Sequence, residues 1–254
     1  MIKKNTSWGG VAGWYNDLVS AEGSYQSELI LPNLKRLLDV KSGERILDIA
    51  CGQGFFSRAW AGLGAKVVGT DIAPELIKFA KEKGGPNEKY FVASADSLGD
   101  KVKAGEFDKA TIVLALQNIE NFNGAISEAG RALKVGGSLF VVLNHPAFRI
   151  PKKSAWGFDE ENKIQYRRID GYLGEFNTSI EMHPGQKDKK ETVSFHRSLQ
   201  LYFKIFNKNG FVVSRLEEWN SQKVSQPGPR QKAEDLARKE IPLFLCLELK
   251  KLLL

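Results

Sequence analysis

The sequence has few of the features that mark secreted, membrane or repeat proteins. Cysteine occurs only twice in 254 residues, as Cys51 and Cys246, which argues against a disulfide framework and favours the reducing cytoplasm. No apolar run approaches the about 20 residues that span a bilayer, and the first residues lack the apolar core of a signal peptide. Internal repeats and low-complexity tracts are also absent. We therefore expect a cytoplasmic globular protein that has no membrane partner.

The sequence has a net positive charge, but its basic residues are not concentrated in one segment. Lysine and arginine number 37 against 30 acidic residues, giving a formal net charge of +7. Such a charge suits anionic partners, including nucleic acid. The basic pairs are scattered, however, and form no stripe with interleaved aromatic residues. A nucleic-acid partner is therefore not expected.

Strand-like and helix-like patterns alternate from residue 28 to residue 144. This alternation predicts a parallel sheet that is covered by helices on both faces. Predicted strands lie at 45–50, 65–72, 89–94, 107–116 and 138–144, and a predicted helix that ends in a glycine turn covers 123–137. The pattern returns with a helix at 198–210 and strands at 211–219 and 242–252. We predict one domain over 1–254 with an insertion at 145–195.

The stretch ILDIACGQGFFSRAW, residues 46–60, gives the clearest ligand signal. It indicates a buried strand around Asp48, a glycine turn and a helix start, where backbone N–H groups can approach a ligand closely. A dinucleotide fingerprint needs glycine or alanine where Ser57 stands. A phosphate-binding loop needs lysine and a hydroxyl residue after the glycines, and these are missing. Both nucleotide interpretations are therefore weak.

A series of motifs instead resembles the class I S-adenosylmethionine-dependent methyltransferases, in their small-molecule, type 11-like branch. DIACGQG resembles their first motif, with Ala50 in place of the first glycine of its fullest form. VVGTDIA, ASADSLG, FDKATIVLALQNIEN and LKVGGSLFVVLN resemble the motifs that follow. The resemblance covers residues 28–145 and the last two strands. It implies a doubly wound, seven-stranded α/β sheet, mostly parallel, with an antiparallel last strand near 241–250.

The resemblance also implies the cofactor, S-adenosylmethionine, its product S-adenosylhomocysteine, and the residues that hold them. Asp71 would accept the ribose hydroxyls, Asp96 the adenine amino group, and Asp48 would support the ammonium side. Other expected cofactor positions are Ala50, Gly52, Gly54, Ile72, Ser97, Leu114, Tyr15 and Tyr25. The two tyrosines belong to predicted cofactor-covering helices in 1–44, and the alternative is that they only staple a helix to the sheet.

The methyl acceptor is expected above the carboxyl ends of the strands, where open α/β sheets bind ligands. His145 follows the fifth strand and is the candidate general base, the alternative being a strand cap. The insertion would form a lid, a dimer contact or both, with short strands at 163–169 and 191–197. Candidate acceptor-pocket residues are Gln117, Asn118, Arg149, Trp156, Tyr166, Arg168 and His196. Arginines there could bind a carboxylate or phosphate, and no residues have metal-ligand spacing.

Three functions remain open at this point. The first is methyl transfer to a small molecule by in-line displacement, which needs alignment more than a strong base. The second is an RNA or protein methyltransferase, and the third is a cofactor-binding protein without turnover. The absence of an RNA-binding module and the intact set of acids and glycines favour the first function. We expect a monomer or a homodimer.

Overall fold

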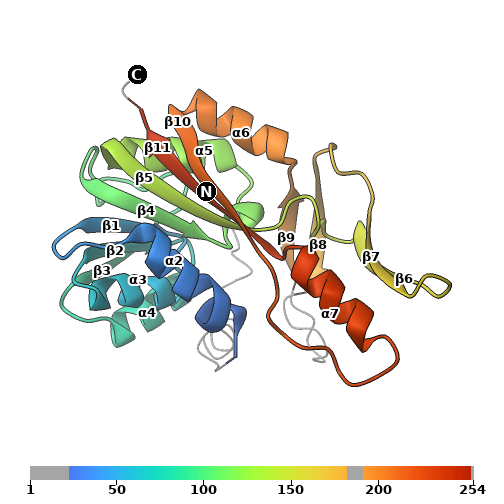
Figure 1. Cartoon of the computed structure of the whole chain (residues 1–254). Coiled ribbons are helices and arrows are strands. Elements are labelled where there is room, and N and C mark those ends of the chain that lie inside the picture. The colour runs from blue at the N-terminus through green and yellow to red at the C-terminus, as the bar shows by residue number, and fades with distance from the viewer. Residues whose placement is uncertain (1–22, 182–190, 253–254) are drawn as a thin grey trace.

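The computed structural model describes residues 23–181 and 191–252, and its centre is a seven-stranded sheet (Figure 1). The strand order is β10-β11-β5-β4-β1-β2-β3. The strands are β1 (Arg45–Ile49), β2 (Lys66–Asp71), β3 (Glu88–Val92), β4 (Phe107–Val113), β5 (Leu133–Asn144), β10 (Phe211–Trp219) and β11 (Phe244–Lys251). β11 runs antiparallel to both β5 and β10, and the pairs from β5 to β3 are parallel. The expected doubly wound sheet with an antiparallel last strand is confirmed.

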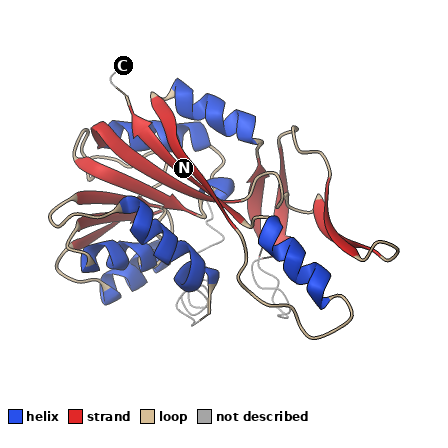
Figure 2. Cartoon of the chain, viewed as in Figure 1, coloured by secondary structure: helices blue, strands red, loops and turns tan. Residues whose placement is uncertain are grey.

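Helices cover both faces of the sheet (Figure 2). They are the π-helical turn η2 (Gln26–Ile30), α2 (Leu31–Leu38), α3 (Phe55–Gly62), α4 (Pro74–Lys83), the 3-10 turn η3 (Leu116–Asn118), α5 (Phe122–Ala132), α6 (Leu199–Lys208) and α7 (Gln231–Glu240). Neighbouring residues of a strand point to opposite faces. Ile46 accordingly packs in the core with Leu34 of α2 and Trp60 of α3, whereas Leu47 packs in the core that contains α5 and α6. None of the helices in the described ranges is long and apolar enough to cross a membrane.

One predicted helix is too long. Residues 123–137, predicted as a helix that ends in a glycine turn, are helical only to Ala132, and β5 already begins at Leu133, which pairs with Phe107 of β4. The residues after Ala132 include the β-branched Val135 and two glycines, which are weaker helix formers than the alanines before them. Pairing with β4 therefore decides the conformation of this segment.

The segment between β5 and α6 forms two small antiparallel pairs outside the main sheet. β6 (Ser154–Asp159) pairs with β7 (Ile164–Ile169), and β8 (Phe176–Glu181) pairs with β9 (Glu191–His196). The short strands expected at 163–169 and 191–197 are confirmed, whereas β6 and β8 were missed. The β6–β7 hairpin extends away from the sheet beyond the end of β5 (Figure 1).

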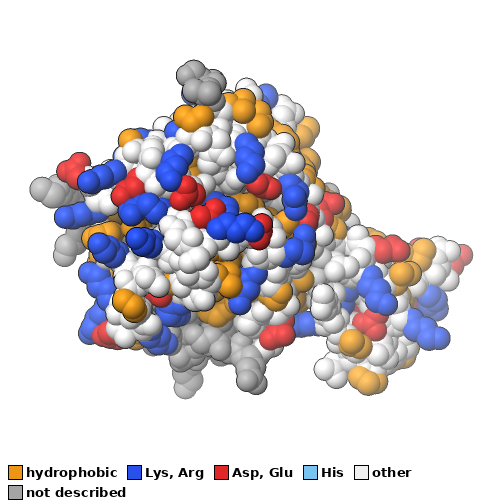
Figure 3. Space-filling view, turned by 60° about the vertical axis from the view of Figure 1, so that its left-hand side comes forward, with side chains coloured by type: hydrophobic (Ala, Val, Ile, Leu, Met, Phe, Trp, Pro, Cys, Tyr) orange, Lys and Arg blue, Asp and Glu red, His pale blue; other side chains and the backbone are white. Residues whose placement is uncertain are grey.

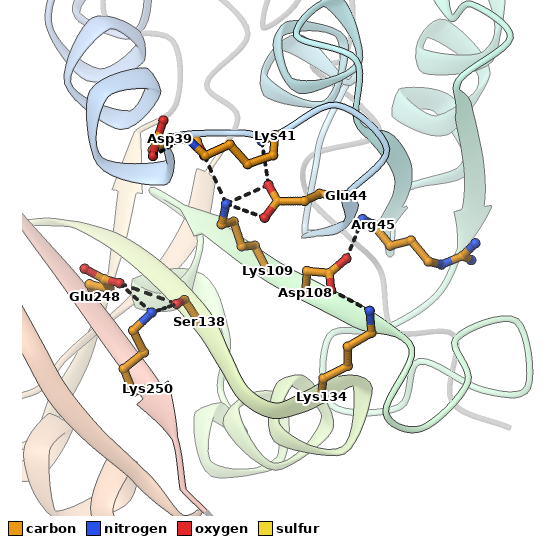
Figure 4. A network of polar contacts seen from close by, with 10 residues as sticks. All are labelled: Asp39, Lys41, Glu44, Arg45, Asp108, Lys109, Lys134, Ser138, Glu248 and Lys250. Atoms are coloured by element: carbon orange, nitrogen blue, oxygen red, sulfur yellow. Dashed lines mark hydrogen bonds and ion pairs between the residues drawn. The ribbon is translucent and has the colours of Figure 1, made fainter.

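Ion pairs occupy the amino ends of the central strands (Figure 4). Lys109 near the start of β4 lies 2.6 Å from the Glu44 carboxylate. Asp108 accepts from the Arg45 backbone N–H at 2.8 Å and pairs with Lys134. These partly exposed pairs have a structural role and stabilise the fold modestly. The opposite edge, where the parallel strands end, is where a ligand site is expected.

Candidate cofactor and acceptor site

The turn that follows β1 requires an unusual backbone. Ala50, Gly52 and Gly54 have φ angles of 55°, 56° and 79°. A Cβ atom on Gly54 would also lie 2.6 Å from the Tyr90 hydroxyl oxygen. Glycine at 54 therefore lets the backbone pass close to Tyr90 and leads directly into α3, whose first residue is Phe55. A bare backbone at the start of a helix can lie against a nucleoside.

Asp71 ends β2 and fixes this turn. Its Oδ2 atom accepts from the Gly52 N–H and its Oδ1 atom from the Ala73 N–H, both at 2.9 Å. Burial raises the pKa of this carboxyl group, which is 7% exposed. Each carboxylate oxygen can accept a further hydrogen bond. Asp71, followed by the half-buried Ile72, therefore fits a site that receives a ribose diol.

Asp48 lies deeper than its predicted role suggests. Its Oδ2 atom accepts from the Ser57 hydroxyl at 2.6 Å and its Oδ1 atom from the Thr111 hydroxyl at 2.8 Å. The carboxyl group is 2% exposed, and burial raises its pKa to about 6. Asp48 therefore links β1 to α3 and β4. Its carboxyl group would influence a cationic cofactor by its charge rather than by direct contact. Ser57, noted in the sequence only as a missing glycine, turns out to hold this acid.

The loop after β3 is held against the start of α5. Asn121 donates from Nδ2 to Asp96 Oδ2 at 3.1 Å, and the Ser94 hydroxyl donates to Asp96 Oδ1. The Ser97 N–H donates to the Ser94 carbonyl at 3.0 Å. Asn121 also caps α5 by accepting from Gly124 N–H. Asp96 and Ser97 therefore lie on an ordered loop, and their role toward adenine stays a prediction.

Two non-glycine residues with positive φ mark the carboxyl edge of the sheet. Ala50 follows β1, and Leu114, with φ of 53°, follows the adjacent β4. Backbone strain of this kind persists where the surrounding structure imposes it, and it clusters at ligand sites. The Leu114 N–H donates to Val142 of β5 at 2.8 Å, which holds it in place.

Relief of this strain should be measurable at Ala50. We expect Ala50→Gly to raise the free energy of unfolding by about 0.5–1 kcal/mol, since glycine avoids a left-handed penalty that exceeds its entropy cost. Chemical denaturation measures the change. Ala59→Gly in α3 is the matched control, and it should lower stability by up to about 1 kcal/mol. A loss of stability in Ala50→Gly would show that the turn does not strain the alanine.

Of the two predicted covering tyrosines, only Tyr25 is described, because Tyr15 lies outside the described residues. The Tyr25 hydroxyl is hydrogen-bonded to the Ser221 hydroxyl at 2.9 Å. Its ring packs edge-on against Phe244, with 5.6 Å between ring centroids. These contacts match the alternative in which the tyrosine only attaches its helix to the sheet.

Two cavities lie where β4 and β5 end and the insertion begins. The first, of about 30 Å³, is bordered by residues of η3, the end of β5 and β9: among them Gln117, Asn144, Arg149, His196 and Arg197. The second, of about 90 Å³, lies between Phe148, Arg149, Trp156, Arg167 and Leu243. Four residues that were predicted for an acceptor pocket line these cavities: Gln117, Arg149, Trp156 and His196. Arg149 lines both cavities.

His145 does not face either cavity. It is 1% exposed, and its Nε2 atom lies 2.7 Å from Glu218 Oε1. Its Nδ1 atom accepts from the N–H groups of Ala147 and Phe148 at 3.2 and 3.4 Å, so the proton belongs on Nε2. Both ring nitrogens are therefore used within the protein. The geometry favours the strand-cap alternative over a general-base role for His145.

His196 is the imidazole that lines the acceptor side. It is 4% exposed, and Nε2 donates to the Tyr172 carbonyl at 2.7 Å. Its Nδ1 atom has no hydrogen-bond partner among the described residues. Burial lowers the pKa of the ring, which keeps it neutral near pH 7. This ring, rather than His145, is suited to accept a proton beside the first cavity.

Three predicted pocket residues lie elsewhere. Tyr166 lies flat over Gly157, its partner across the β6–β7 hairpin, and is 47% exposed. Arg168 pairs with Asp170 at 2.9 Å on the exposed surface. Asn118 donates from Nδ2 to the Val193 carbonyl at 3.1 Å and so joins η3 to β9. None of the three borders the two cavities.

Arg197 was missed by sequence reasoning. Its buried guanidinium donates to the carbonyls of Leu116, Ile119 and Glu120. It thereby holds the end of the insertion against η3. No local pattern distinguishes such an arginine from a surface one. Within the described ranges, no group of three or more His, Cys, Asp or Glu side chains is placed to hold a metal.

Comparison with known proteins gives consistent matches. A family model described as a methyltransferase domain matches residues 47–141. The ubiquinone biosynthesis O-methyltransferase of Xanthomonas oryzae pv. oryzae is 37% identical over 103 residues, which are 39% of this chain and 43% of that protein. The demethylmenaquinone methyltransferase of Tropheryma whipplei is 35% identical over 115 residues, 44% of this chain and 46% of that protein. The matched region thus spans less than half the length of these curated relatives.

A solved structure extends the likeness over most of the chain. An S-adenosylmethionine-dependent methyltransferase from Mesorhizobium loti superposes with a TM-score of 0.68 and 26% identity, covering 87% of this chain and 96% of that one. The sheet order and glycine turn described above agree with this match. The chain therefore has the fold of the class I S-adenosylmethionine-dependent methyltransferases, and residues 47–141 match a methyltransferase domain, in agreement with the cofactor that the motifs predict.

Proposed function

We propose that the protein transfers the methyl group of S-adenosylmethionine to a small-molecule acceptor. The observation that carries this proposal is the pair of cavities at the ends of β4 and β5, which are bordered by the predicted acceptor residues Gln117, Arg149, Trp156 and His196. The curated relatives are named for methylation in ubiquinone biosynthesis and of demethylmenaquinone, both small molecules.

The residues of the site divide into two groups. Asp71 would hold the ribose, the backbone at Gly52 and Gly54 the nucleoside, and Asp96 the adenine. When bound, the cofactor supplies a methyl group activated by an adjacent positive sulfur. The chain's own contribution is alignment of the acceptor, which is worth up to roughly 7–11 kcal/mol in favourable cases. His196 would accept a proton where the acceptor carries one.

The insertion at 145–195 would act as the lid of this site. It begins where β5 ends, and through Phe148 and Trp156 it supplies apolar walls that exclude water. Arg197 joins its far end to η3. The lid would therefore be attached at the end of β5 and, just beyond its far end, at η3.

An RNA acceptor is the alternative function, and the described surface gives it little support. Lysine and arginine side chains are interspersed with acidic ones over the face drawn in Figure 3. Several basic side chains are also neutralised, as in the pairs Arg36–Glu217 and Lys109–Glu44. A backbone-tracking groove would instead present a continuous basic stripe.

The direct test has two stages. Calorimetry should show S-adenosylhomocysteine binding to the purified protein, with no comparable binding of NAD. A labelled methyl donor is then incubated with protein and a metabolite extract, with total RNA or with cell protein. We expect label in the metabolite fraction. Label in RNA or protein would support the alternative acceptor, and binding without any transfer would indicate a cofactor-binding protein.

A further inference from the structure

Arg149 is a solvent-exposed arginine whose guanidinium has no assigned partner among the described residues. It borders both cavities. Among the described residues, no hydrogen bond or ion pair engages its guanidinium. The neighbouring arginines differ in this respect. Arg167 donates to the Phe148 carbonyl and the Ser154 hydroxyl, both at 2.8 Å, and Arg197 donates to three carbonyls.

Among the residues that the structure describes, those around Arg149 are positively charged. Arg167 borders the second cavity with it, and Arg197 borders the first. Within the described part of the chain, no aspartate or glutamate lines either cavity. Burial and the neighbouring charge of Arg149 both lower the pKa of Arg167. Guanidinium groups gathered in this way normally have a carboxylate or phosphate between them.

The backbone that carries Arg149 is fixed in place. The Arg149 N–H donates to the His145 carbonyl at 2.8 Å, and His145 Nδ1 accepts the two preceding N–H groups of the turn. Glu218 accepts a hydrogen bond from the other ring nitrogen, Nε2. His145 is therefore a positioning residue for the turn that presents Arg149. Such preorganisation reduces the entropy lost when a ligand binds.

A second polar atom in the first cavity lacks a partner. Gln117 donates from Nε2 to the Leu114 carbonyl at 2.7 Å, and its buried Oε1 atom has no hydrogen-bond partner. A buried acceptor without a donor is costly, and a ligand hydroxyl or amine would satisfy it. Gln117 follows β4 at the edge where the glycine turn also lies.

We propose that the methyl acceptor carries a carboxylate or phosphate group, which Arg149 binds, and a hydroxyl or amine, which Gln117 orients. Phe148 and Trp156 form the apolar wall beside the anion. That the ligand is a methyl acceptor rests on the proposed function, but the anion site itself can be tested without turnover. The ligand is distinguished from the quinone-type substrates named for the relatives by its charge.

Simple aromatic anions probe the site directly. Benzoate, phenylphosphate and the uncharged benzamide are titrated by calorimetry into the protein, both alone and with S-adenosylhomocysteine present. We expect benzoate or phenylphosphate to bind at least tenfold more tightly than benzamide, and the better of the two identifies the anion. Arg149→Gln should reduce that affinity at least tenfold, and Arg149→Lys less, because lysine keeps the charge without the bidentate fork.

Arg215→Gln is the matched control, since Arg215 lies on β10, is half exposed and pairs weakly with Glu248 at 3.7 Å. It should leave anion affinity unchanged, and thermal melting checks the fold of every variant. Equal binding of benzamide and the anions, no binding of either anion, or full affinity in a folded Arg149→Gln would overturn the anion site. Failure of S-adenosylhomocysteine to bind the unmodified protein would instead count against the proposed function.

Discussion

Arg197→Ala should lower the free energy of unfolding by about 3–5 kcal/mol. The side chain is 5% exposed and donates to three backbone carbonyls at 2.8 to 3.2 Å. Its guanidinium also lies 4.4 Å from the centre of the Phe122 ring. Alanine leaves these carbonyls without their donor and opens a cavity between η3 and the insertion. The loss therefore combines lost hydrogen bonds with lost packing.

Equilibrium denaturation in urea measures this loss. Arg215→Ala serves as the control, because that arginine is half exposed and its ion pair is long, so that its removal should cost less than about 1 kcal/mol. Arg197→Lys should be intermediate, since one ammonium cannot reach three carbonyls in a fork geometry. An Arg197→Ala protein as stable as the control would mean that η3 is held in place without the arginine.

Asp71→Asn should weaken S-adenosylhomocysteine binding by about 10- to 100-fold, or about 1.4–2.7 kcal/mol. The substitution keeps the size of the side chain but removes the charge that favours bidentate acceptance from a diol. It also places an amide N–H₂ group against one of two backbone N–H donors, Gly52 or Ala73. The glycine turn then loses one of its attachments to the end of β2.

Calorimetry on Asp71→Asn and on the control Asp170→Asn separates the two outcomes. Asp170 is an exposed partner of Arg168, and its variant should bind the cofactor product as the unmodified protein does. Thermal melting gives the cost to the turn independently of binding. Unchanged affinity in Asp71→Asn, or preferential binding of NAD, would remove Asp71 from the ribose assignment.

The sheet could be predicted from the sequence because its signals are local. Buried runs such as Ile46–Ile49, glycine turns and helical periodicity identify each element, and alternation predicts parallel pairing. The acceptor side could not be predicted to the same depth. His145 and His196 both follow strand patterns, yet only the tertiary partners Glu218 and Tyr172 show what each ring nitrogen does.

Adjacent arginines in the insertion illustrate the same limit. Arg167 and Arg168 are neighbours on β7, and successive residues of a strand face opposite sides. The register with β6 pairs Arg167 with Trp156, whose ring lies 5.1 Å from the guanidinium, and this places Arg167 at the cavity. Arg168 faces Asp170 instead. Without that register, the sequence offers both arginines as anion ligands and cannot show that only Arg167 reaches the cavity.

The position of β11 in the sheet has a consequence for synthesis of the chain. β11 lies between β5 and β10, although both of those strands precede it in sequence. During translation, β5 and β10 therefore emerge from the ribosome with open backbone edges, and they stay open until Phe244–Lys251 follows. Open edges invite pairing with other chains. Completion of the sheet must be a late step, and the nascent chain is exposed to aggregation until that single strand is inserted.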